Sequence, residues 1–234
     1  MIVNDTFLDR VAHDLRGELA TMLAGLHYLQ RFGTEGSSSS RNILARVTEA
    51  GDRLTRLLDE FDDAAWLLEQ PKPLTLESLS LRTLGRELLE RSAKLTVLRG
   101  VELRLDLLDD DEREFMGDRE MLVRALLYVA DFAMLRATSG EIRATAGFIN
   151  DVPVVRIIDE GPAVPEFLQP TLCDPFVENE LASLLPAGRR RVRMGLGLAI
   201  SRAIIEAHRG SLILESLEPP QHPGLAFHCR LARP

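Results

Sequence analysis

The sequence has few aromatic residues, little lysine and no long hydrophobic run. The lack of such a run argues against a membrane-spanning protein. Aromatic residues make up 5% of the 234 positions. No apolar run approaches the roughly 20 residues of a membrane-spanning helix, and the N-terminus lacks a signal-peptide pattern. The basic residues are nearly all arginine, which points to a GC-rich bacterial genome. We therefore expect a cytoplasmic bacterial protein with no membrane segment in this chain.

The cysteines argue against a zinc protein, and the net charge argues against a nucleic-acid-binding protein. Cys173 and Cys229 stand far apart, with no second cysteine or histidine at metal-ligand spacing, so we expect reduced thiols and no zinc site. A formal net charge of −8 disfavours nucleic acid as the main partner. With 45% hydrophobic residues, the chain can build one large or two modest domains.

The first 70 residues are patterned as two long helices. Residues 4–32 carry an apolar stripe and residues 41–69 a heptad seam, while residues 33–40 are typical of a flexible turn. The stripe residues are Leu8, Val11, Leu15, Met22, Leu26 and Leu29, and the seam residues are Ile43, Val47, Ala50, Leu54, Leu57, Phe61, Ala64 and Leu68. One hairpin cannot cover both faces, so we expect a homodimer that forms a four-helix bundle. Residues 70–73 (Gln-Pro-Lys-Pro) predict a stiff linker.

One histidine stands on the first helix where the core does not need it. His13 lies off the apolar stripe, and Asp14 follows it at once. A lone helical histidine is most often an ordinary surface residue. A neutral imidazole is nevertheless nucleophilic and titrates near physiological pH, and an adjacent carboxylate can orient its ring or accept its proton. The rest of the chain decides between these interpretations.

Beyond residue 74 the pattern changes to mixed helix and strand. Residues 101–107 alternate apolar and charged side chains, as half-buried strands do, and Asn150 and Asp151 mark a turn between strands. The other expected strands are 74–81, 141–148, 152–159, 211–216 and 225–231, and the expected helices are 84–98, 118–138 and 198–208. Helices grouped with a largely antiparallel sheet predict a two-layer α/β sandwich. The sequence thus predicts two domains, residues 1–70 and 74–234, of α and α/β class.

Two short motifs in the second domain carry chemistry. Asp159 ends a strand, and the chain then turns sharply through Gly161. Gly195 and Gly197 open a helix, where backbone N–H groups can approach an anion closely and the helix dipole favours negative charge. By itself the glycine pair is equally typical of a helix packed tightly on a sheet. Its combination with the upstream turn makes the pattern specific.

Together these segments resemble the two-component sensor histidine kinases over nearly the whole chain. Residues 11–16 are similar to the phospho-acceptor box of that family, and residues 74–234 to its catalytic ATP-binding domain, whose fold gyrase, heat-shock chaperone and mismatch-repair ATPases share. The resemblance implies that His13 accepts a phosphoryl group beside Asp14, and that Asp159 binds the adenine amino group. The other nucleotide-binding residues that it implies are Gly161, Phe176, Gly195 and Gly197. It makes residues 160–194 an ATP lid, whose arginines at 189–193 lie near the phosphates or form a solvated loop.

The chain departs from this family where the family binds metal. The ATP-binding helix of the family carries two asparagines that help bind Mg²⁺ and phosphate, and Tyr128 and Phe132 stand in their places here. Neither ring supplies the oxygen ligands that Mg²⁺ demands, and Asp131 points about 100° away around the helix. We therefore expect no metal site, and ATP or ADP bound only weakly. In the acceptor box, Gly17 and Glu18 replace the usual Thr or Asn and the proline.

Three functions remain open. The first is a histidine kinase with an atypical ATP site that passes a phosphoryl group from His13 to a response regulator aspartate. The second is a histidine phosphotransferase with a decayed ATP domain, and the third is a non-enzymatic pseudokinase or scaffold. The intact His13 and Asp14, beside a missing asparagine pair, favour retained phosphohistidine chemistry over retained autokinase activity. The expected partners are a second copy, the receiver domain of a response regulator and, in the third case, another histidine kinase.

Overall fold

The computed structural model describes residues 5–32, 38–67, 73–108, 113–175, 177, 185, 195–217 and 223–231. The chain divides into two compact units, Met1–Leu68 and Glu69–Pro234. Within the described residues, no helix is both long enough and apolar enough to cross a membrane.

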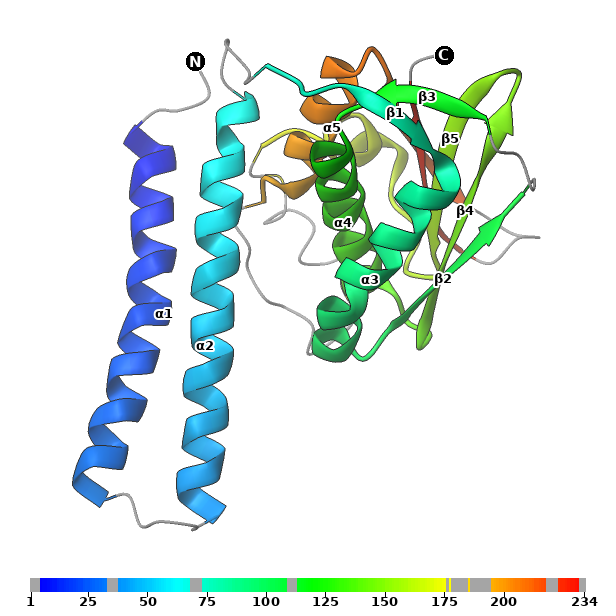
Figure 1. Cartoon of the computed structure of the whole chain (residues 1–234). Coiled ribbons are helices and arrows are strands. Elements are labelled where there is room, and N and C mark those ends of the chain that lie inside the picture. The colour runs from blue at the N-terminus through cyan, green and yellow to red at the C-terminus, as the bar shows by residue number, and fades with distance from the viewer. Residues whose placement is uncertain are drawn as a thin grey trace. The chain divides into compact units, whose positions relative to one another are not determined.

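The first unit is a pair of long helices (Figure 1). They are α1 (Asp5–Phe32) and α2 (Ser38–Asp63), and a single 3₁₀ turn, η1 (Ala64–Leu67), follows α2. α2 begins three residues earlier than the sequence predicts, within the expected flexible turn. Serine is favoured where helices begin, so the serine run there extends the helix rather than the turn.

A close contact at Gly25 and an ion pair between Arg53 and Glu18 hold α1 against α2. At Gly25 the helices approach so closely that a Cβ would overlap the Val47 side chain. Arg53 Nε of α2 lies 2.8 Å from Glu18 Oε2 of α1. Three residues of the expected seam are buried, namely Ala50, Leu57 and Ala64. Other large apolar side chains remain exposed, among them Leu19, Leu23, Leu26, Leu44, Leu58 and Phe61.

The second unit is a two-layer α/β sandwich, as the sequence predicts (Figure 1). Its five-stranded sheet has the order β2-β4-β5-β7-β6, with β2 and β4 parallel and the other neighbours antiparallel. A separate two-stranded sheet pairs β1 with β3. The strands are β1 (Glu77–Ser80), β2 (Glu102–Leu107), β3 (Glu114–Gly117), β4 (Glu141–Ile149), β5 (Val152–Asp159), β6 (Ser211–Leu217) and β7 (Gly224–Arg230).

Three helices cover one face of the five-stranded sheet. They are α3 (Leu81–Arg99), α4 (Arg119–Arg136) and α5 (Gly197–Ala207). Alternate residues of the central strands face them and are buried, for example Ala144 of β4 and Ile157 of β5. α4 packs between α3 and α5 as well as on the sheet, which explains why it is apolar on nearly all sides.

Two short elements escaped the sequence prediction, whereas the central hairpin is confirmed. β3 has only four residues, too few for an alternation to stand out, and the 3₁₀ segment η2 (Glu166–Thr171) lies in a stretch expected to be irregular. β4 and β5 pair antiparallel around the predicted turn. Asn150 and Asp151 there have φ of 52° and 61°, a conformation that these two residue types tolerate better than most.

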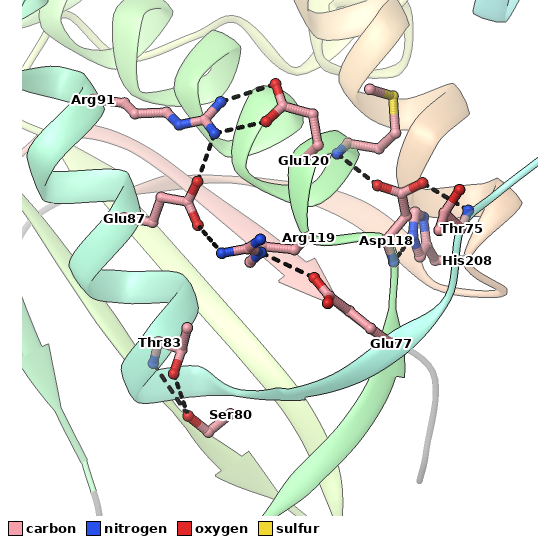
Figure 2. Close-up of polar contacts among 11 residues, drawn as sticks. Thr75, Glu77, Ser80, Thr83, Glu87, Arg91, Asp118, Arg119, Glu120 and His208 are labelled. Carbon is pink, nitrogen blue, oxygen red and sulfur yellow. Dashed lines mark hydrogen bonds and ion pairs between the residues drawn. The ribbon is translucent and has the colours of Figure 1, made fainter.

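A buried set of hydrogen bonds fixes the start of α4 (Figure 2). The Asp118 carboxylate caps the helix at Met121 N, 3.1 Å away, and also accepts from Thr75 N at 2.8 Å. The Asp118 N–H donates to His208 Nε2 at 2.9 Å, so the His208 proton is on Nδ1, 2.7 Å from Ile204 O. Burial lowers the pKa of His208, which keeps the ring neutral. The C-terminal end of α5 is thereby tied to the N-terminal end of α4.

Candidate functional site

Asp159 and Gly197, two of the residues that the sequence assigns to nucleotide, lie on β5 and α5, and both of these elements contact α4. Asp159 is the last residue of β5, and Gly197 is the first residue of α5. α4 contacts both of these elements and carries the two aromatic replacements. Phe176 and the arginines at 189–193 lie outside the described residues, so their predicted roles stay predictions.

The Asp159 carboxylate accepts from four donors of this chain. Arg136 Nε donates to Oδ2 at 2.9 Å, and Arg136 Nη2 lies 3.5 Å from Oδ1. The backbone N–H groups of Gly161 and Leu225 also donate to Oδ1, at 2.8 and 3.3 Å. Burial raises the pKa of Asp159, and Arg136 and these two N–H groups act in the opposite direction. Three of these four donors therefore meet Oδ1, and one meets Oδ2.

Arg136, which the sequence analysis did not single out, is the other half of this buried ion pair. It is the last residue of α4 and is 0% exposed, which is rare for arginine. Its Nη2 also donates to Pro162 O at 2.5 Å, and Nη1 has no partner among the described residues. A Cβ on Gly161 would lie 2.7 Å from Arg136 O. The turn after β5 therefore packs directly on the ion pair.

Tyr128 lies against the glycines that open α5. A Cβ added to Gly197 would come within 3.1 Å of the Tyr128 ring, so ring and helix start are in direct contact. Gly195, two residues earlier, has a φ of 74°, a left-handed conformation that favours glycine. Ser201 Oγ donates to Ala125 O, 2.9 Å away, and joins α5 to α4 just below. An aromatic ring thus stands beside the expected phosphate cradle.

Phe132 and Asp131 point in different directions, as the helical rotation predicts. The Phe132 ring is buried against Phe227 of β7, edge to face, with the ring centroids 5.9 Å apart. Asp131 faces α3 instead, where Arg99 Nε lies 2.8 Å from its Oδ1. Asp131 is therefore committed to a different ion pair and does not substitute for the missing asparagines.

These residues do not fit adenine and Mg²⁺ in the manner that the resemblance implies. The carboxylate expected to accept from adenine is buried and is ion-paired with Arg136. Aromatic rings occupy the two positions from which amide oxygens would reach a metal, and Mg²⁺ takes oxygen ligands. Within the described parts of the chain, no three His, Cys, Asp or Glu residues group to hold a metal ion.

The predicted phospho-acceptor lies on the first unit. His13 is exposed on α1, whereas the side chain of Asp14 lies outside what the structure describes. One turn further on, the Gly17 carbonyl accepts from Thr21 Oγ1 at 3.0 Å. α1 runs without a break through Glu18, where the family has proline, and Glu18 is used in the ion pair with Arg53.

Comparisons with known proteins agree with this architecture. Residues 117–234 match the family model described as "Histidine kinase-, DNA gyrase B-, and HSP90-like ATPase". The chain is 32% identical over 228 residues to the sensor protein DivL of Caulobacter vibrioides, covering 96% of this chain but only 27% of DivL.

Two solved structures share the fold. The Acinetobacter baumannii histidine kinase AdeS aligns with a TM-score of 0.67 at 18% identity, over 94% of this chain and 98% of that one. The histidine kinase ThkA, in complex with the response regulator protein TrrA, aligns with a TM-score of 0.68 at 17% identity, over 97% and 62%.

Proposed function

The chain belongs to the two-component histidine kinase branch of the histidine kinase-, DNA gyrase B- and HSP90-like ATPases, and we propose that it carries a phosphoryl group on His13. Within that branch, we propose a histidine phosphotransferase that takes the group from a phosphorylated partner rather than from ATP. The buried ion pair between Asp159 and Arg136 carries this proposal, because the Arg136 guanidinium uses the carboxylate that would accept from the base of ATP. Autokinase activity with an atypical ATP site is the alternative.

The chemistry suits an exposed imidazole. In its neutral form the His13 ring attacks the phosphorus of an aspartyl phosphate on a partner, so that a P–N bond forms while the P–O bond to the partner carboxylate breaks. The same step in reverse passes the group to a second regulator aspartate. His13 is exposed, which such a partner requires. Asp14, the next residue, is proposed to orient the ring or accept its proton.

The proposed partners follow from the same family. The exposed apolar side chains of α1 and α2 support a homodimer through the helical hairpin. The ThkA structure, which contains a response regulator, supports a receiver domain as the partner of His13. Nucleotide is proposed to bind weakly and without a contribution from Mg²⁺, because the residues that face the expected site are aromatic or already paired.

Two labelling experiments separate the proposed activities. The protein is incubated with γ-labelled ATP and Mg²⁺, and separately with a response regulator labelled at its aspartate. We expect acid-labile label from the regulator and none from ATP. Label taken directly from ATP would contradict the phosphotransferase proposal and establish the autokinase.

Variants on α1 then assign the acceptor. His13→Ala should abolish labelling, whereas His27→Ala, another exposed histidine of the same helix, should leave it unchanged. Asp14→Asn should slow labelling by on the order of 10²- to 10⁴-fold, as loss of general acid–base catalysis does. Persistent label on the His13→Ala protein would refute the assignment of His13.

A further inference from the structure

We propose that Arg136 is an internal occupant of the base subsite, whose guanidinium makes with Asp159 the contact that a purine amino group would otherwise make. The site would then accept a planar aminopurine once the Arg136 side chain is removed. This inference concerns the second unit alone and does not depend on phosphoryl transfer through His13. The proposed function states only that nucleotide binds weakly, whereas this inference names the side chain that closes the base subsite.

The chemistry of the two groups is closely matched. A guanidinium is flat and presents N–H donors in its own plane, and the amino group of adenine likewise presents an in-plane N–H donor to a carboxylate. In this structure the plane is set by two contacts, from Arg136 Nε to Asp159 Oδ2 at 2.9 Å and from Nη2 to Oδ1 at 3.5 Å. The guanidinium therefore uses the same carboxylate edge that the base would use.

The surroundings of the ion pair are those of a closed site rather than of a surface ion pair. Arg136 and Asp159 are 0% and 1% exposed, whereas the ion pairs of Arg91 with Glu120 and of Arg119 with Glu77 involve partly exposed side chains. Gly161 lies over both residues, and a Cβ there would be 2.9 Å from Asp159 Oδ1. One guanidinium nitrogen, Nη1, is buried without a partner among the described residues.

The test is to remove the side chain and offer the base. The full-length protein and Arg136→Ala are titrated with adenosine, which has no phosphate and needs no metal, and binding is followed by the thermal midpoint and by calorimetry. We expect Arg136→Ala to bind adenosine at millimolar concentration, and the unaltered protein to bind it about tenfold more weakly or not measurably. N6,N6-dimethyladenosine, which has no amino N–H, should not bind to either.

A second ligand and a control variant make the result specific. Methylguanidinium, the smallest mimic of the missing side chain, should stabilise Arg136→Ala and compete with adenosine. Arg99→Ala breaks the other low-exposure ion pair, with Asp131, and should respond to neither compound. If Arg136→Ala does not fold alone, it is refolded with methylguanidinium or adenosine present, and folding with either supports the proposal.

Three results would overturn it. One is adenosine binding as tight to the unaltered protein as to Arg136→Ala. Another is a folded Arg136→Ala protein that binds neither compound. The last is a variant that refolds with neither. Each of these leaves the labelling of His13 by a phosphorylated regulator untouched, so failure here is distinguishable from failure of the proposed function.

Discussion

Phe132 and Tyr128 occupy equivalent positions one helical turn apart, but they differ in how deeply they are buried. Phe132 is 5% exposed and packs edge to face on Phe227, an arrangement that adds about 0.5–1.5 kcal/mol to simple burial. Tyr128 is only half-buried and lies against Gly197. Each ring therefore contributes to stability as well as excluding the amide that the family places there.

We expect Phe132→Asn to lower the free energy of unfolding by roughly 3–5 kcal/mol, because it opens a cavity and buries an amide. Tyr128→Asn should cost less, since part of that ring already contacts water. Urea denaturation followed by circular dichroism measures both. Phe167→Asn, at a side chain that is 76% exposed, is the control and should change stability by no more than about 0.5 kcal/mol. A Phe132→Asn protein as stable as this control would show that the ring is not part of the core.

Residue-level prediction from the sequence succeeded where the reasoning was local to one helix. The direction of Asp131 follows from helical rotation alone, and its ion pair with Arg99 agrees. Arg136 could not be found in this way, because its partner Asp159 is 23 residues away, on a strand. The C-terminal ends of α4 and β5, which carry these two residues, are brought together only by the packing of α4 on the sheet. The only signal was a charged residue at the end of a helix that is otherwise largely apolar.

At the scale of elements, a side chain caps the N-terminus of α3 and another caps that of α4, but only the cap of α4 also contacts a distant part of the chain (Figure 2). Ser80 caps α3 by accepting from Thr83 N at 3.1 Å. Asp118 caps α4 and also holds Thr75, which precedes β1 in the sequence. Asp118 therefore fixes both a helix start and the path of the chain into the second unit.

We expect Ser80→Ala to cost about 1 kcal/mol of stability, the usual value for a lost N-cap. Asp118→Ala should cost roughly 2–4 kcal/mol, because it also leaves the Thr75 N–H without its acceptor. Chemical denaturation of the two variants side by side provides the comparison. Equal losses would mean that the contact with Thr75 contributes nothing to folding.

The order and type of most elements could be predicted, and the exceptions have physical causes. The hairpin of β4 and β5 follows from alternation and from turn residues that tolerate positive φ. The parallel pairing of β2 with β4 gives no comparable local signal, because a whole helix and strand intervene between them. Likewise β3 is too short for its period to be recognised.

At the scale of the whole molecule, the helical hairpin leaves an apolar stripe uncovered. Leu19, Leu23 and Leu26 follow one another at steps of four and three along α1, and each is more than 40% exposed. This spacing places them on one face of the helix, and exposed apolar surface of that kind marks an interface. The sequence predicts this need for a partner, because one hairpin cannot cover the apolar faces of both helices.

We expect the protein to be a dimer at micromolar concentration, with a mass by light scattering of twice that of the chain. Leu23→Glu should give a monomer, because it places a charge in the middle of the uncovered stripe. Val97→Glu, on α3 at a side chain that is 86% exposed, should leave the dimer intact. A monomeric unaltered protein would contradict the proposed bundle.

The buried Arg136–Asp159 pair also restricts how this lineage can evolve. Changing either residue alone leaves the other charge buried without its partner, which costs about 3–5 kcal/mol out of a typical total stability of about 5–15 kcal/mol. Mutations at these two positions are therefore tolerated mainly in combination. Across homologues the two positions should covary, with arginine at the first found together with an acid at the second. Replacement of both residues by successive single substitutions therefore has to pass through a poorly folded intermediate.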